Sequence, residues 1–196
     1  MTPQTNRQKQ ALKTKHKIFH CALSLFAEKT YESITVQDIC SAADVSVGAF
    51  YHHFKSKDNL LDEGYRLFDD QVEDLWNLEH PKEILAQISF LVSIQTKSID
   101  QMGPFASMQY FKNQLSNSEK YILNADRFFY KKIKETIQTG ISSALLSGSA
   151  EEITEEILCL TRGIIYDWGL HQGSYSLEER TSKMLSILLE HYKNEK

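Results

Sequence analysis

The sequence predicts an all-α protein. Only three prolines and eight glycines occur among its 196 residues, so long stretches lack the residues that interrupt helices. Apolar residues recur at intervals of three and four, which is the spacing of one helix face, and no segment shows the alternation of a strand. The length suffices for one substantial core, or for a small domain joined to a larger one.

A long helix and then a short one are predicted for the start of the chain. The long helix, over 11–29, follows from one apolar stripe: Ile18, Ala22, Leu25 and Phe26. Thr35 with Asp38 resembles a capping box, in which each residue satisfies a free backbone N–H of the other. This pair predicts the start of a helix over 36–42.

A second short helix comes directly after the first. The small residues Ala42-Ala43-Asp44 predict a tight turn, and Ser46 is positioned to cap a helix over 46–53. Two short helices joined by so tight a turn form a helix-turn-helix, here over 35–54. The second helix of such a motif enters a major groove of DNA with its N-terminal residues facing the base edges.

Cap and break residues divide the rest of the chain. Ser56 precedes one helix, Pro81 fits the first turn of the next, and Ser176 with Glu179 forms a second capping box. The breaks are Gly103-Pro104, Ser147-Gly148 and Gly173-Ser174. The predicted helices are 57–78, 81–100, 104–114, 118–146, 151–171 and 177–193. The stripe behind 118–146 is Ile122, Ala125, Phe129, Ile133 and Ile137.

The net charge of −4 is unevenly distributed. Residues 1–60 contain eight Lys and Arg against five Asp and Glu, a net charge of +3, which leaves −7 for residues 61–196. A basic first part suits a protein whose front end meets a polyanion. Ordinary surface charge explains the same numbers equally well, so charge alone does not decide.

Enzymatic, metal and membrane functions find no support in the sequence. The three cysteines (Cys21, Cys40 and Cys159) are scattered without a C-x-x-C motif, as is typical of reduced cytosolic proteins. His16 and His20 have helical spacing, but no neighbouring Cys or carboxylate completes a metal site. No nucleophile, zinc or phosphate-loop motif occurs, nor an apolar span or export signal. We expect a cytoplasmic protein that is not an enzyme and has no cofactor or metal.

The ring-rich stretch after Gly48 divides by helical spacing. Phe54 is expected to pack into a small core, while Tyr51 and His52 point outward to phosphates. Lys57 lies at a helix N-terminus, where its ammonium and free backbone N–H groups would share a phosphate. The missing side chain of Gly48 allows close approach of either a sugar-phosphate strand or the preceding helix.

Residues 11–65 resemble the N-terminal domain of the TetR (tetracycline-repressor-like) family of bacterial transcription regulators. The matching segments are I-F-H-C-A-L-S-L-F from Ile18, T-V-Q-D-I from Thr35, and A-D-V-S-V-G-A-F-Y-H-H-F-K-S-K-D-N-L-L through Leu61. The resemblance implies a DNA-binding domain over 1–60 and a helical domain for ligand binding and dimerisation over 61–196.

The resemblance also implies roles for individual residues. Phosphate contacts are implied for Thr35, Tyr51, His52 and Lys57. Roles at or near the base edges are implied for Ser46, Val47, Ala49 and Phe50. An N-terminal arm would add contacts to the backbone or minor groove from Arg7, Lys9, Lys13, Lys15 and Lys17.

The last two predicted helices are the expected interface of a homodimer. Their apolar stripes are Ile153, Ile157, Leu160, Ile164 and Trp168 on one helix, and Met184, Leu185, Leu188 and Tyr192 on the other. Two such helices per subunit can form a four-helix bundle around a two-fold axis. Because each helix has more apolar positions than one face holds, we expect them to serve the subunit's own core as well.

The middle of the chain is rich in aromatic residues, which favours a small-molecule pocket between helices. The residues expected in its walls are Phe105, Gln109, Phe129, Tyr166 and Trp168. An aromatic stripe at helical spacing is more often core than pocket, and an acidic, aromatic body suits a cationic or large apolar ligand.

The sequence is therefore interpreted as a homodimeric transcriptional regulator. In this family such a protein is most often a repressor, released from a palindromic operator by an unknown small-molecule effector. The alternative is a helical interaction or adaptor protein that keeps the fold without regulated DNA binding. Salt-dependent binding to one palindromic duplex distinguishes the two.

Overall fold

The computed structural model describes residues 5–116 and 120–194. Over these residues every regular element is a helix, which confirms the predicted all-α class. The elements are α1 (Asn6–Glu28), η1 (Tyr31–Ser33), α2 (Val36–Ala42), α3 (Val47–His53), α4 (Lys57–Leu78), α5 (Ile84–Met102), α6 (Pro104–Ser116), η2 (Tyr121–Leu123), α7 (Phe128–Ser142), α8 (Ala150–Leu170) and α9 (Leu177–Tyr192). None of the described helices is both long and apolar enough to cross a bilayer.

The helix predicted over 118–146 is wrong at both ends. α7 begins only at Phe128, after the single turn η2, and it ends at Ser142. Asn124 interrupts the expected helix because its side-chain oxygen accepts the N–H of Asp126 at 2.7 Å, a local bond that competes with helix formation. The chain then leaves α7 through Ala144 in the left-handed region, at φ 57°. Residues 118 and 119 of the prediction lie outside the described residues.

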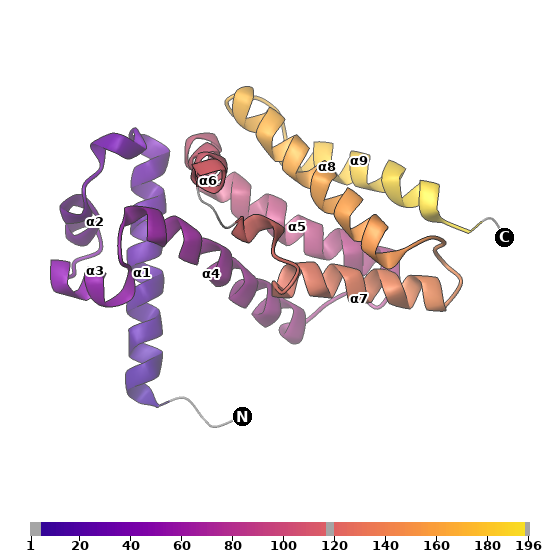
Figure 1. Ribbon diagram of the computed structural model, residues 1–196, viewed down its shortest axis with the longest axis horizontal. Helices are drawn as coiled ribbons and strands as arrows, with labels where there is room; N and C mark the ends of the chain where they lie inside the picture. The colour runs from indigo at the N-terminus through magenta and orange to yellow at the C-terminus, as the bar shows by residue number, and fades with distance from the viewer. Residues whose placement is uncertain (1–4, 117–119, 195–196) are drawn as a thin grey trace.

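The N-terminal helices form a compact unit, which we call the head. Figure 1 shows α2 and α3 on one side of α1, with the start of α4 crossing it. Large side chains from all four helices fill its core, among them Phe26, Phe50, Phe54 and Leu60, each no more than 1% exposed. The predicted packing of Phe54 into a small core is therefore confirmed, and Phe26 and Leu60 belong to the same core.

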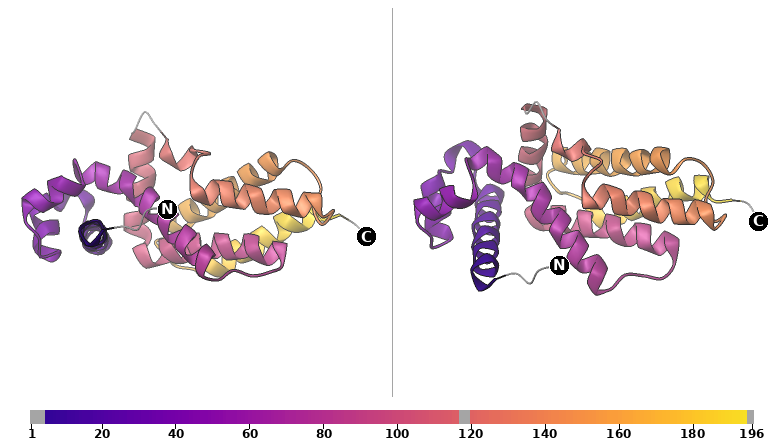
Figure 2. Two further views of the ribbon diagram at one scale, coloured as in Figure 1. Left: turned by 90° about the horizontal axis from the view of Figure 1, so that it is seen from below. Right: turned by 60° about the horizontal axis from the view of Figure 1, so that its bottom comes forward.

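The remaining helices form the body. α5, α7, α8 and α9 enclose a second core, which contains Ile88, Leu91, Ile133, Ile137 and Ile157. A smaller cluster around Trp168 joins α8 to the start of α9. Figure 2 shows the head and body at opposite ends of the molecule, with α4 between them.

Two helices bring the head and body together. α4 contributes Leu61 to the head core and Val72 to the body core, and α6 leans Tyr110 against the head. Gly64 makes this contact possible, since a Cβ there would lie 2.0 Å from the Tyr110 hydroxyl and 2.8 Å from Phe19. Side chains therefore pack across residue 60, the predicted boundary between the two domains. The division of the chain into domains at this residue stays a proposal.

Candidate nucleic-acid interface

Side-chain caps hold the two short helices of the motif. The Thr35 hydroxyl accepts the Asp38 N–H at 3.1 Å, and the Asp38 carboxylate accepts the Thr35 N–H at 2.8 Å. These bonds form the predicted capping box. The Asp38 carboxylate also accepts the Thr35 hydroxyl at 2.6 Å, and the bonds from this hydroxyl and from the Thr35 N–H lower the pKa of the Asp38 carboxyl because both favour its charged form. Since α2 has only seven residues, the cap secures a large share of its backbone N–H groups. Thr35 is exposed and available to DNA, but its first role is structural.

The turn between the helices is tight. Asp44 adopts a left-handed conformation at φ 47°, which reverses the chain, and the Val45 N–H donates to the Cys40 carbonyl at 3.0 Å. Ser46 then caps α3 by accepting the Ala49 N–H at 3.1 Å. The predicted helix-turn-helix therefore forms with both of its predicted caps.

The side chains of α3 separate into a buried and an exposed set. Tyr51 is 56% exposed and Val47 is 37% exposed, while Ser46 and His52 are also exposed and Ala49 is half-buried. These positions form the outer face of α3. They are therefore free to meet DNA.

Phe50 corrects the sequence prediction. Its side chain is 0% exposed. Its ring packs edge-on against that of Tyr51, with 5.4 Å between ring centres, and in a tilted arrangement against that of Phe54, with 5.6 Å between ring centres. It points into the head core, so it cannot reach a base edge. The sequence already indicates this, because Phe50 lies four residues before Phe54, the C-cap residue of α3 that also packs into the head core.

Gly48 faces open space. A Cβ built on it would meet only the Ser46 hydroxyl oxygen, at 3.8 Å. Of the two close approaches considered for this glycine, contact with the preceding helix is therefore wrong. Approach of a sugar-phosphate strand stays a prediction.

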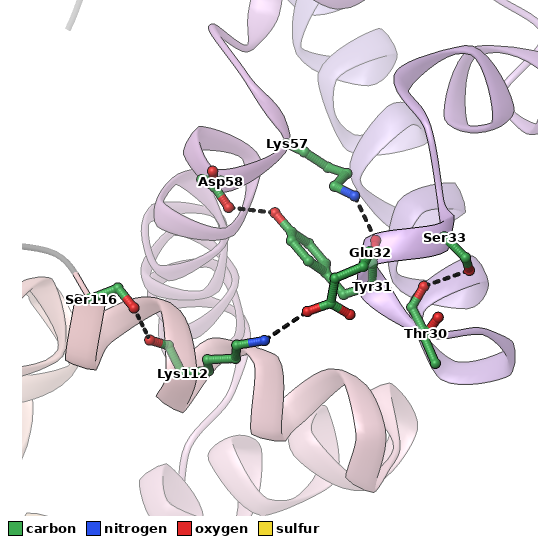
Figure 3. Close-up of polar contacts among 8 residues, drawn as sticks. All are labelled: Thr30, Tyr31, Glu32, Ser33, Lys57, Asp58, Lys112 and Ser116. Carbon is green, nitrogen blue, oxygen red and sulfur yellow. Dashed lines mark hydrogen bonds and ion pairs between the residues drawn. The ribbon is translucent and has the colours of Figure 1, made fainter.

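Lys57 is engaged within the head (Figure 3). Its ammonium donates to the Tyr31 carbonyl at 2.5 Å and to the Ile34 carbonyl at 2.6 Å, and it lies 4.1 Å from the centre of the Tyr31 ring. Burial lowers the pKa of its ammonium. With two of three N–H groups directed at carbonyls, Lys57 mainly fastens η1 to the start of α4. Its phosphate contact stays a prediction, for which the third N–H is available.

The basic residues before the motif lie on a helix. α1 begins at Asn6, so the chain from that residue on is not an extended arm. Arg7, Lys13 and Lys17 are exposed, whereas Lys15 forms an ion pair with Glu63 of α4 at 2.6 Å. The side chain of Lys9 lies outside the described ones.

The structure adds a contact that sequence reasoning missed. Lys112 of α6 forms an ion pair with Glu32 of η1 at 2.7 Å and so joins the body to the head, as Figure 3 shows. The two residues are 80 positions apart. No local pattern in the sequence marks such a pair.

The five predicted pocket residues do not come together. Phe105 and Tyr166 are 63% and 48% exposed, and Gln109 is half-buried. Phe129 belongs to the body core, while Trp168 belongs to the separate cluster and donates its indole N–H to the Tyr175 carbonyl at 3.0 Å. These residues are divided between the surface and two separate buried clusters, and their role as pocket walls stays a prediction.

The apolar stripes of α8 and α9 mainly serve the subunit's own core. Ile153, Ile157, Ile164 and Trp168 are buried, as is Leu185. Other residues of the two helices are exposed. Among them are Cys159, Gly163, Tyr166 and Leu170, which share one side of α8 by helical spacing, and Ile187 on α9. Across the described residues, no three His, Cys, Asp or Glu side chains lie close enough together to bind a metal ion.

Comparisons with known proteins agree with this geometry. The model of bacterial regulatory proteins of the tetR family matches residues 18–63. The regulator AcrR of Shigella flexneri is 26% identical over 200 residues, covering 94% of this chain and 92% of AcrR. The transcriptional repressor KstR2 of Rhodococcus jostii is 24% identical and covers 86% of each chain.

Solved structures show the same fold. The regulator FadR of Bacillus subtilis, solved in complex with stearoyl-CoA, superimposes with a TM-score of 0.69 at 16% identity. The match covers 89% of this chain and 97% of FadR. The shared arrangement therefore extends through the body as well as the head.

Proposed function

The chain belongs to the tetR family of bacterial regulatory proteins, and we propose that it is a homodimeric repressor released from a palindromic operator by a small molecule. One observation supports this above the others. The capped helix α3 turns its large ring Phe50 inward and leaves Val47, Gly48 and Tyr51 on an open face. A helix of this kind fits a major groove with its first turn towards the bases.

Dimerisation is proposed through the exposed face of α8 and α9. Leu170 and Ile187 are 62% and 57% exposed, and a Cβ on Gly163 would meet nothing within 4 Å. An apolar face with a small residue allows two helices to approach closely. A two-fold axis there would present two heads to half-sites about 34–36 Å apart, one turn of DNA.

An effector that binds the body is proposed because the family relatives include ligand-bound structures such as FadR. A groove of about 260 Å³ lies between α5 and α9, lined in part by Phe90, Thr96 and Leu185. This volume is below the roughly 300–1,000 Å³ of most ligand sites. Binding of a large apolar ligand would therefore separate body helices, and α4 would transmit that change to the head.

Selection of bound duplexes from a random pool tests DNA recognition. We expect a palindromic sequence whose binding weakens steeply with salt, because Lys and Arg contacts release counterions from the phosphates. A binding curve that shows no preferred sequence would support the adaptor alternative instead.

Thermal unfolding with a panel of acyl-CoA thioesters and apolar cations tests the effector. A true effector should raise the unfolding temperature of the free protein and release it from the selected operator. By linkage, the factor by which it weakens operator binding equals the factor by which operator weakens effector binding. Compounds that stabilise the protein and leave the operator complex intact would contradict the proposal.

A further inference from the structure

A buried charged contact joins α4 to α7. Asp69 of α4 and Arg127, the residue before α7, are 7% and 8% exposed. The guanidinium binds the carboxylate through two bonds, from Nε at 2.9 Å and from Nη2 at 3.2 Å. The Asp69 carboxylate also accepts the backbone N–H of Phe129 at 3.2 Å.

Three aromatic rings surround the guanidinium. Its central carbon lies 5.0 Å from the ring centre of Tyr65, 5.6 Å from that of Tyr121 and 5.9 Å from that of Phe68. Cations are attracted to ring faces at such distances. We call these three rings together with Asp69 and Arg127 the Asp69 joint.

Asp69 also caps α7 from a neighbouring helix. Arg127 occupies the N-cap position of α7 but makes no capping bond with its own side chain. The carboxylate of Asp69 replaces that bond at Phe129 and places a negative charge at the positive end of the α7 dipole. The direction of α4 is therefore coupled to the start of α7.

The segment that brings Arg127 and Tyr121 into the joint is otherwise loosely packed. Within residues 120–127 Arg127 is the one buried residue, and Leu123 is 56% exposed. Polar contacts to α6 hold the rest, such as the Ile122 N–H with the Gln114 side chain at 3.0 Å. The segment is thus held on α4 by Arg127 and by the ring of Tyr121, whose centre lies 5.7 Å from that of Tyr65, and Arg127 supplies its buried polar contact.

A buried ion pair contributes more to the relative orientation of the elements it joins than to the stability of the fold. Replacing such a pair with apolar residues of similar volume is often neutral for folding, because the desolvation of two charges offsets their attraction. Two parallel N–H···O bonds, however, fix the relative orientation of the groups they join. In this molecule the oriented element is α4, which begins in the head core and ends in the body.

We propose that Asp69 and Arg127 are positioning residues for DNA binding, which set the angle of α4 and with it the separation of the two heads in the dimer. The inference rests on the proposed DNA-binding function. According to this proposal, the spacing of the two half-sites is selected by residues that lie more than ten positions beyond the helix-turn-helix. No contact of either residue with DNA is involved.

The test measures spacing preference and compares it with affinity. The full-length protein is bound to its selected operator and to two versions with one central base pair inserted or deleted. The wild type should discriminate against both altered operators by about tenfold or more, a typical cost of one misplaced contact. The double variant Asp69→Leu with Arg127→Met should bind all three nearly equally, because its helices pack without a fixed orientation.

A matched control and a second variant complete the design. Asp126→Asn breaks the exposed pair with Lys131, at 2.9 Å in the same segment, and should keep the wild-type spacing preference. Asp69→Asn keeps the side-chain volume and is measured as well, so that the test does not depend on the folding of the double variant. Thermal unfolding shows that each variant is folded at the assay temperature.

The outcomes separate cleanly. Lower affinity with the wild-type ratio among the three operators would mean that the pair only stabilises the fold, and would overturn this inference. Wild-type protein with no preferred duplex would instead overturn the proposed function and this inference with it. Loss of spacing preference in the Asp69 variants, with the ratio kept in Asp126→Asn, would establish the positioning role.

Discussion

At the scale of single residues, the outer face of α3 should separate affinity from base preference. Tyr51 is exposed and is proposed to donate its hydroxyl to a phosphate. Tyr51→Phe should weaken binding to all duplexes alike, by about 0.5–1.5 kcal/mol for one hydrogen bond. Its salt dependence should not change, because no charge is removed. Binding measured on the operator and on an unrelated duplex checks this result.

Val47→Ala is the comparison variant for Tyr51→Phe. The exposed Val47 at the start of α3 is proposed to contact bases, so its truncation should change the preferred sequence in a repeated duplex selection. A changed sequence with Tyr51→Phe and an unchanged one with Val47→Ala would reverse the two assignments.

Phe50 should affect folding and leave base preference alone. Its side chain is completely buried between α3 and the head core. Phe50→Ala should lower the free energy of unfolding by about 3–5 kcal/mol. Phe50→Leu, which keeps most of the volume, should cost less than about 1.5 kcal/mol and select the same operator. Urea unfolding and duplex selection measure the two effects, and a new base preference in Phe50→Leu would restore Phe50 as a contact residue.

Local sequence predicts such residues only in part. The caps Thr35 and Ser46 were predictable because a cap depends on neighbours within three positions. The internal role of Lys57 was not, since its two carbonyl partners lie 26 and 23 residues away on the chain. A lysine near a helix N-terminus offers a phosphate contact and an internal bond equally well, and only the folded head decides between them.

At the scale of elements, the cap of α3 can be separated from its contact with DNA. Ser46 accepts the Ala49 N–H and is also exposed at the proposed interface. Ser46→Asp should keep the cap, because Asp is as good a cap as Ser, whereas Ser46→Ala should cost about 0.5–2 kcal/mol of stability.

Operator affinity should rank the two Ser46 variants in the opposite order, with Ser46→Ala binding more tightly than Ser46→Asp. The carboxylate of Ser46→Asp would face the phosphates of DNA, and operator binding should fall by on the order of tenfold or more, as for one unfavourable contact. Ser46→Ala should lose less. Thermal unfolding and operator titration on both variants test the split, and full operator affinity in Ser46→Asp would place Ser46 away from DNA.

The elements were predictable where caps and apolar spacing agree, and α7 shows the limit. Its apolar stripe continues backwards through Ala125 and Ile122, so periodicity predicts one helix from 118 onward. The Asp126 N–H donates to the Asn124 side chain and Arg127 contacts Asp69, and with these two contacts α7 begins only at Phe128. One of these is a side-chain alternative to helix formation, and the other comes from a helix 58 residues away. Neither is visible in the spacing of apolar residues.

At the scale of the whole molecule, sequence stripes do not distinguish a subunit's own core from an interface. Ile164 and Leu185 were expected to serve both, and both are buried within the single subunit. The same helical spacing describes either use, since both require one continuous apolar face. Because Leu170 and Ile187 are exposed in the folded chain, we propose that they meet a partner subunit.

Ile187→Glu should therefore separate the dimer without unfolding the subunit. Ile187 is 57% exposed, so a charge there stays in water in the monomer, whereas dimerisation would bury it unpaired at a cost of several kcal/mol. Gln138→Glu adds the same charge on the exposed side of α7 and should leave the dimer intact. A monomeric Ile187→Glu should also lose tight operator binding, because one head covers one half-site. Sedimentation and operator titration measure both effects, and an unchanged dimer in both Ile187→Glu and Leu170→Glu would exclude this face as the interface.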